Sequence, residues 1–157
     1  MKHVKKSVLL WYSARQMFDL VVDIPAYPQF LPWCDRAEVL EQSEHSMTAR
    51  LGLSFSGIKH AFTTRNTHIT NQRVVVELVD GPFSLLEGAW DFIPLGRRSG
   101  AEPGELSDVG ACRVELDLRY AFRSLALEAL VSPVFDRIAN TLVDSFVKRA
   151  ESVYGPR

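Results

Sequence analysis

Polar side chains able to hydrogen-bond or bind metal recur along one face of a predicted strand over residues 59–69. His60, Thr64, Asn66 and His68 fall at even positions beside Phe62, and successive side chains of a strand alternate between its two faces. The two histidines are about 27 Å apart at roughly 3.3–3.4 Å per residue, so they cannot bind one metal ion. These residues are candidates for hydrogen bonds to a ligand, not for metal chemistry.

Motifs for catalysis are absent from the sequence. It contains no HExxH, CxxC or GxSxG motif and no glycine-rich phosphate loop. Cys34 has two interpretations, a reactive thiol or a small buried residue. Asp80 precedes Gly81-Pro82 and is interpreted as a turn residue. We therefore expect a binding protein and not an enzyme, with no metal site and no required cofactor.

Composition indicates an ordinary globular domain. With 157 residues, residues 1–157 are expected to form a single domain, and apolar residues make up 46 %. The formal net charge of −1 implies no bulk attraction to DNA, RNA or anionic lipid. Two cysteines do not form a disulfide framework, and no apolar run reaches the roughly twenty residues that span a bilayer. A cytoplasmic location is expected, with peripheral contact to the inner face of the membrane left open.

The longest periodic stretch covers residues 124–154 and predicts an amphipathic helix. Its apolar residues are three or four positions apart, the spacing of one helical face. They are Leu127, Val131, Val134, Phe135, Ile138, Leu142, Phe146, Ala150 and Val153, with Asp136 among the residues assigned to the solvated face. Pro133 leaves two alternatives: it kinks the helix, or Ser132-Pro133 starts the main helix as N-cap and first turn.

The rest of the chain is mostly strand. Alternating segments predict strands over 3–11, 47–55, 59–69, 74–79, 86–92 and 112–122, and Ser13 to Gln16 has the spacing of a capping box that begins a short helix. Residues 96–110 are interpreted as a flexible hairpin insert. Short turns favour antiparallel pairing. The expected fold is α+β, with a curved antiparallel sheet of six or seven strands around the long C-terminal helix.

The segment 26–33 is unusually apolar for a connection and contains Tyr27, Phe30, Leu31 and Trp33. One interpretation is a loop that folds back and plugs the core. The other is the rim of a pocket or a contact surface, because large exposed apolar patches often mark binding sites. Its prolines exclude a long helix.

Polar residues on the inward face of the sheet suggest a cavity. Besides His60, Thr64, Asn66 and His68, this face includes Gly88, and a tightly packed core rarely holds so many polar groups. An aromatic-lined cavity between sheet and helix would accommodate them and match the usual character of ligand sites. The alternative is that the polar end of the strand extends past the helix into water.

Four motifs in this order resemble the coenzyme Q-binding, START-like family. They are Tyr27–Cys34, Phe62–Asn66, Val79–Phe83 with Trp90–Phe92, and the helix from Val134 to Ala150. The resemblance extends over residues 3–154 and departs from the family at the insert 96–110 and at Pro133. It implies a helix-grip fold and two functions. One is to bind ubiquinone, a polyprenyl quinone, as a lipid chaperone for respiration. The other, from the family's ribosome association toxin branch, is to bind the large ribosomal subunit and block subunit association.

The resemblance and the strand pattern together suggest a cavity lining. Its candidate residues are Phe30, Trp33, Phe55, Phe62, Thr64, Asn66, Phe83, Leu86, Trp90, Phe92, Phe135, Ile138, Leu142 and Phe146. Phe30 to Trp33 and Pro82-Phe83 would form an apolar mouth. For ribosome binding, the local basic groups are Lys2, Lys5 and Lys6, and Arg97 with Arg98; solvated surface charge is the alternative. A polyketide cyclase-like enzyme is a third, remote possibility without a convincing acid/base pair.

Overall fold

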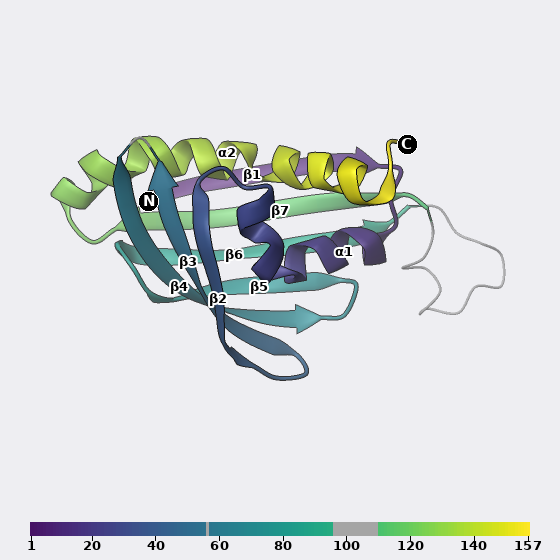
Figure 1. Ribbon diagram of the computed structural model, residues 1–157, viewed down its shortest axis with the longest axis horizontal. Helices are drawn as coiled ribbons and strands as arrows, with labels where there is room; N and C mark the ends of the chain where they lie inside the picture. The colour runs from purple at the N-terminus through teal and green to yellow at the C-terminus, as the bar shows by residue number, and fades with distance from the viewer. Residues whose placement is uncertain (56, 96–109) are drawn as a thin grey trace.

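The long helix α2 (Leu125–Tyr154) lies across one antiparallel sheet of seven strands that curves around it (Figure 1). The computed structural model describes residues 1–55, 57–95 and 110–157. The strands are β1 (Lys2–Leu10), β2 (Cys34–Gln42), β3 (Ser46–Phe55), β4 (Ile58–Ile69), β5 (Arg73–Asp80), β6 (Phe83–Pro94) and β7 (Cys112–Phe122). Their order in the sheet is β1-β7-β6-β5-β4-β3-β2. The α+β helix-grip arrangement expected from the sequence is confirmed.

Two short helices close one end of this arrangement. They are α1 (Ala14–Val22) and the 3-10 helix η1 (Ile24–Gln29). Ser13 caps α1 in a capping box: the Gln16 backbone N–H donates to the Ser13 hydroxyl, and the Ser13 N–H donates to the Gln16 side chain. The sequence predicted this cap.

Helix α2 runs through Pro133 without interruption. Its N-cap is Ser124, whose hydroxyl accepts from the Leu127 N–H at 3.1 Å. The alternative in which the main helix begins at Ser132-Pro133 is therefore wrong. Ser132 instead lies in the interior of the α2 sequence, its side chain is buried, and its hydroxyl donates to the Asp136 carboxylate at 3.3 Å.

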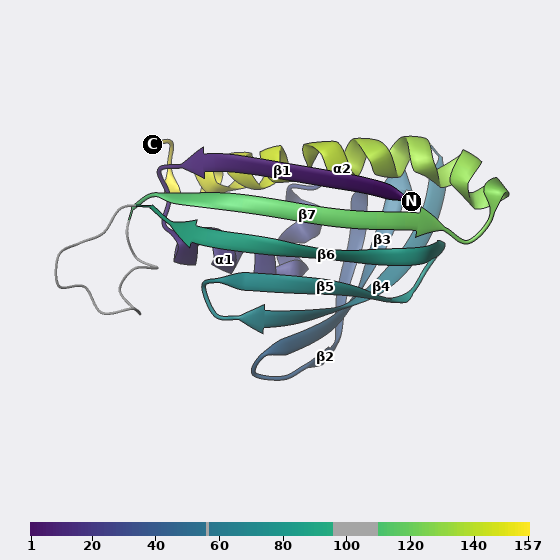
Figure 2. The same cartoon turned by 180° about the vertical axis from the view of Figure 1, so that it is seen from behind.

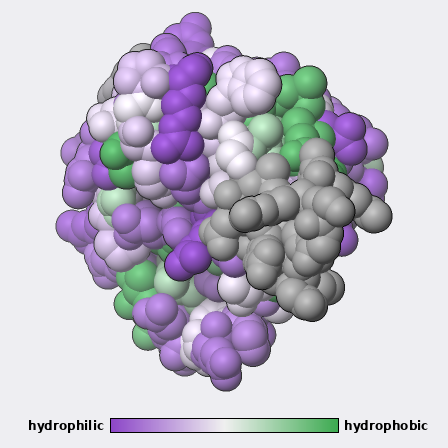
Figure 3. All heavy atoms as spheres, turned by 90° about the vertical axis from the view of Figure 1, so that its right-hand side faces the viewer, coloured by the Kyte–Doolittle hydropathy of each residue, from purple (hydrophilic) through white to green (hydrophobic). Residues whose placement is uncertain are grey.

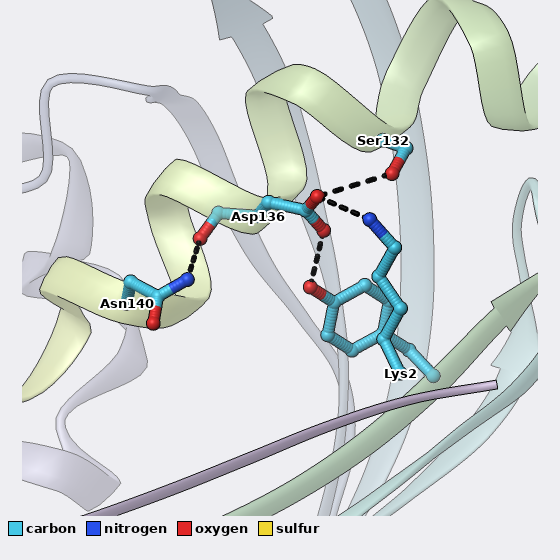
Figure 4. Close-up of polar contacts among 5 residues, drawn as sticks. Lys2, Ser132, Asp136 and Asn140 are labelled. Carbon is cyan, nitrogen blue, oxygen red and sulfur yellow. Dashed lines mark hydrogen bonds and ion pairs between the residues drawn. The ribbon is translucent and has the colours of Figure 1, made fainter.

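Asp136 joins three elements and is not a solvated-face residue, contrary to the sequence interpretation. Its carboxylate accepts hydrogen bonds from Ser132, from Tyr120 on β7 at 2.5 Å, and from the Lys2 ammonium on β1 (Figure 4). Position 136 lies where the flank of α2 meets the β1 edge of the sheet. A side chain at that boundary contacts both strands, which the helical spacing alone does not reveal.

Strand β2 was not predicted. It is an edge strand paired to β3, with register shifts between Cys34 and Arg36 and between Val39 and Glu41. These irregularities break the alternation by which a strand is recognised in sequence. The β6–β7 pairing extends to Pro94 and Cys112, while the predicted insert at 96–110 lies almost wholly outside the described residues.

The apolar segment after α1 folds back onto the core. Leu31 is 1 % exposed and Trp33 is 8 % exposed, which confirms the plug interpretation. Phe83 is buried as well, at 3 %. The exposed apolar mouth suggested for these segments is therefore wrong for Leu31, Trp33 and Phe83, whose side chains are buried, whereas Phe30 is half-buried and Pro32 is exposed.

Candidate ligand cavity

A cavity of about 90 Å³ lies between the concave face of the sheet and α2. Helix α2 supplies one wall through Phe135, Ile138, Ala139, Leu142 and Phe146. These positions are three, four or seven residues apart along one helical stripe, with Ala139 beside Ile138. The predicted apolar stripe is thus the face that borders the cavity.

The sheet and the two short helices supply the other walls. From the sequence-predicted site, the structure brings together Trp33, Phe62, Thr64, Asn66, Leu86, Trp90, Phe135, Ile138, Leu142 and Phe146 around the cavity. Lining residues absent from that prediction are Val21, Ile24, Tyr27, Leu51, Val74, Val76, Gly88, Leu116, Leu118 and Ala139. Alternation marks most of these as inward residues. The positions of α1 and η1 at the end of the cavity depend on tertiary contacts, and the alternation of apolar and polar residues does not predict such contacts.

Three predicted phenylalanines pack next to the cavity without lining it. Phe30 contacts the ring of Phe146, with centroids 5.2 Å apart. Phe83 packs on Phe135 at 4.8 Å. Phe92 lies under α1, its ring 5.7 Å from that of Phe18. The side chain of Phe55 lies outside the described part of the chain.

Two neighbouring polar side chains face the cavity. Thr64 and Asn66 are buried on β4, and the Thr64 hydroxyl donates to the Asn66 side-chain oxygen at 3.1 Å. This bond uses the oxygen of the Asn66 amide, whose nitrogen carries two N–H donors. This pair is what the sequence predicted for a polar spot in an aromatic cavity.

The two histidines of the same strand do not line the cavity. His60 borders a surface groove together with Arg50 and Lys59. His68 packs edge-on against Phe18, with centroids 6.0 Å apart. Burial, and secondarily the neighbouring His45, lowers the pKa of His68 below its usual value. Their places at the strand ends correspond to the alternative interpretation of polar residues lying past the cavity.

The cavity is small for a drug-sized ligand. Such ligands occupy sites of roughly 300–1,000 Å³, whereas this cavity has about 90 Å³. A larger ligand can enter only if part of the wall moves. The walls that belong neither to the sheet nor to α2 are Val21 of α1 and the segment from η1 to Trp33.

The lining offers little for acid/base chemistry. Tyr27 is the one titratable group among the described lining residues, and its hydroxyl donates to the Val21 carbonyl at 2.5 Å. Burial, with smaller effects from Cys34 and Asp23, raises the pKa of Tyr27 above its usual value. Cys34 is buried beside it, and burial raises the pKa of its thiol to about 11. This favours the buried-residue interpretation of Cys34, because the nucleophile is the thiolate.

Neither a metal cluster nor a membrane-spanning helix is found in the described ranges 1–55, 57–95 and 110–157.

The end of the molecule beside the C-terminus presents a mainly hydrophilic surface, with hydrophobic patches separated by polar residues where the surface is visible (Figure 3). Exposed apolar side chains do occur, including Trp11 at 70 %.

A family model described as polyketide cyclase / dehydrase and lipid transport matches residues 10–147. A protein named ribosome association toxin RatA from Pseudomonas aeruginosa is 39 % identical over 153 residues, which cover 98 % of this chain and 98 % of that protein. A mitochondrial coenzyme Q-binding protein, the COQ10 homolog B of Xenopus laevis, is 29 % identical over 151 residues, covering 96 % of this chain and 58 % of that protein.

Solved structures share the fold over nearly the whole chain. The ZhuI aromatase/cyclase from Streptomyces sp. R1128 superposes with a TM-score of 0.77 at 16 % identity, covering 96 % of this chain and 93 % of that one. A START superfamily protein from Mycobacterium smegmatis gives 0.69 at 22 % identity, covering 96 % and 98 %. At these identities the likeness is one of fold.

Proposed function

Because the chain belongs to the polyketide cyclase, dehydrase and lipid transport family, we propose that it binds ubiquinone between the sheet and α2, as a lipid-binding protein supporting respiratory electron transport. The observation that carries this proposal is the cavity itself, an aromatic and aliphatic enclosure with one polar pair, Thr64 and Asn66. The likeness to a coenzyme Q-binding protein supports the choice of ligand.

The two parts of a polyprenyl quinone fit the two kinds of lining residue. A quinone carbonyl accepts hydrogen bonds, and the Asn66 amide has two N–H donors to offer. The isoprenoid tail is apolar, and burying it contributes about 0.8 kcal/mol of favourable binding free energy per CH₂ group. The rings of Trp90 and Phe146, which contact each other at 5.2 Å between centroids, would lie along it.

Binding requires the cavity to enlarge. Its volume of about 90 Å³ is below the range of ligand sites, and the η1 segment is held to α2 by side-chain contacts, not by strand pairing. We propose that this segment moves away from Phe146 when the ligand enters.

Binding without catalysis is proposed, although the fold also occurs in an aromatase/cyclase. A cyclase must move protons, and an effective acid or base has a pKa near the working pH. The described lining contains Tyr27 alone as a titratable group, and burial raises its pKa away from that range.

The test is extraction of the purified protein with organic solvent followed by mass spectrometry, and titration with a short-tail ubiquinone. Trp33 and Trp90 line the cavity, so saturable quenching of tryptophan fluorescence is expected. Ala139→Leu should weaken binding at least tenfold, because Ala139 is fully buried and borders the cavity. Ala129→Leu, on the exposed side of the same helix, is the control. Absence of both a co-purifying isoprenoid and saturable quenching would refute quinone binding.

A second candidate function is binding to the large ribosomal subunit, with a block on subunit association. The observation that favours it is the 39 % identity over 98 % of the chain to a protein named ribosome association toxin. Lys5 and Lys6 on the exposed edge strand β1 are candidate contacts with RNA. Lys2 is already bound to Asp136, and Arg97 and Arg98 lie outside the described residues.

Overexpression followed by a sucrose-gradient profile tests this second function. A fall in the ratio of joined ribosomes to free subunits is expected, with a smaller fall for the variant carrying Lys5→Glu and Lys6→Glu. An unchanged ratio would reject it. Profiling Ala139→Leu in parallel shows whether the ribosome effect needs the cavity. Either function would be exercised in the cytoplasm, with peripheral contact to the inner face of the membrane for quinone exchange.

A further inference from the structure

The sheet splits between β5 and β6. Their ladder begins at Arg73 and Asp91 and ends at the pair Glu77 and Glu87. Beyond that pair, β5 stays with β4, and β6 stays with β7. Residues 78–80 of β5 and 83–86 of β6 therefore face each other without pairing.

Local side chains and backbone geometry accompany the split. Glu77 and Glu87 lie directly opposite each other at its edge, and like charges in that position disfavour pairing. On the other side of β6, Gly88 lies so close to β7 that an added Cβ would be 2.7 Å from the Asp117 carbonyl oxygen. Strand β6 thus packs tightly against β7. On the N-terminal side of Glu87, it no longer pairs with β5.

A groove of about 540 Å³ occupies the outer side of the split. Figure 2 shows this outer face, with β7, β6 and β5 in the foreground and α2 above them. The groove has apolar residues such as Val75 and Leu85 and charged residues such as Arg73 and Arg119. It shares Val76, Leu86 and Gly88 with the inner cavity. These three residues border both spaces, and one of them, Gly88, has no side chain.

The polar pair of the cavity lies beside these shared residues. Asn66 is the cross-strand partner of Val76, and Val76 is the partner of Gly88. Thr64 is the partner of Leu78, which borders the outer groove. Trp90, Phe146 and Tyr27 line the other end of the cavity, toward η1. The polar pair therefore lies at the end next to the split, where Phe62 and Phe135 also line the cavity.

We propose that the split between β5 and β6 is the opening at which the quinone ring is held, with the tail directed inward toward Trp90 and Tyr27. This inference rests on the proposed quinone binding and adds an orientation and an entrance. A quinone ring at Asn66 would lie behind the residues that line both the groove and the cavity, so it would be reached from the outer face of the sheet. The split gives the ring access to solvent or to a redox partner while the tail stays enclosed.

Paramagnetic labels test the orientation. A nitroxide is attached at Val79→Cys, an exposed position in the unpaired part of β5, or at Asp23→Cys, an exposed position between α1 and η1. Native Cys34 and Cys112 are buried, so each label is confined to the introduced thiol. The ligand is ubiquinone with two isoprene units, observed by proton NMR.

The label at Val79→Cys is expected to broaden the ring methoxy signals more than the terminal tail methyls, and the label at Asp23→Cys should do the reverse. The opposite pattern would overturn the orientation while leaving quinone binding intact. No saturable binding to any variant would overturn quinone binding itself and the orientation with it.

A blocked entrance provides the second measurement. Leu85→Trp places a large side chain in the outer groove at a position that does not line the cavity. At least a tenfold slower association of the quinone is expected in stopped-flow fluorescence, while Ile69→Trp, on an exposed site of β4, should match the native protein. Equal rates for a folded Leu85→Trp variant would contradict entry through the split. If that variant does not fold, the label experiment alone decides.

Discussion

The Arg149 guanidinium lies over the ring of Phe30, 5.0 Å from its centroid. The same guanidinium donates to the Gln29 side-chain oxygen at 3.2 Å. Phe30 in turn packs against Phe146, a lining residue of the cavity. The Arg149 side chain thus contacts the segment that we propose moves when the cavity enlarges.

Arg149→Met should loosen that segment while keeping an apolar stem of similar length. Loss of a cation–π contact worth roughly 0.5–1 kcal/mol and of one hydrogen bond should lower the free energy of unfolding by about 1 kcal/mol. Amide exchange in residues 24–31 should accelerate severalfold, and quinone should associate faster. Hydrogen exchange with mass spectrometry measures the first effect. Lys148→Met, an exposed neighbour, is the control, and equal exchange in the two variants would show that Arg149 does not hold the segment.

Asp136 should make stability depend on acid pH. Burial raises its pKa, but hydrogen bonds from Lys2, Tyr120 and Ser132 outweigh this, and the net effect lowers the pKa. A lowered folded-state pKa means that the carboxylate stabilises the fold above the unfolded-state pKa of about 3.9 and that this stabilisation is lost as pH falls through the folded-state value.

Asp136→Asn should therefore lower the free energy of unfolding by about 1–2 kcal/mol at pH 7, with the partial exposure of the site limiting the effect. The difference from the native protein should shrink below about pH 4. Urea denaturation across a pH series measures it. Asp144→Asn, exposed on the same helix, should show neither effect; a difference at Asp136 that stays constant with pH would contradict the proposed linkage.

If Asn66 binds the quinone ring, its loss should lower the affinity for ubiquinone more than the affinity for a ligand that has only the tail. Asn66→Ala should weaken ubiquinone binding about tenfold, as expected for loss of one hydrogen bond of about 1.4 kcal/mol. Binding of an isoprenoid alcohol without a quinone ring should change less than twofold. Isothermal titration of both ligands supplies the comparison, and an equal loss for both would mean that Asn66 shapes the cavity without contacting the ring.

Both cysteines should resist thiol reagents in the folded protein. Burial raises the pKa of Cys34 and of Cys112 to about 11, so little thiolate exists at pH 8. Reaction with a disulfide reagent should be at least a hundredfold slower than in guanidinium chloride, where both thiols should react. Rapid reaction of one thiol under native conditions would show that its surroundings open locally.

The sequence predicts the parts of this fold that follow simple periods. The α2 stripe and the alternation of β7 identify both walls of the cavity, because side-chain direction follows directly from helical and strand geometry. Thr64 and Asn66 are identifiable for the same reason.

Other features depend on contacts between segments distant in sequence. The irregular pairing of β2 hides its alternation. The place of Asp136 depends on Lys2, 134 positions away. The split depends on which strand β5 and β6 each follow after Glu77 and Glu87. None of these relations has a local period, so the sequence pattern gives no indication of them.

Strand β1 has a consequence for how the chain folds. Its partner in the sheet is β7, with Lys2 opposite Tyr120 and Leu10 opposite Cys112. Contacts of such large sequence separation carry a high loop-closure entropy and slow folding. During synthesis, β1 is made more than a hundred residues before the strand that it pairs with, and its hydrogen-bonding edge stays open until then.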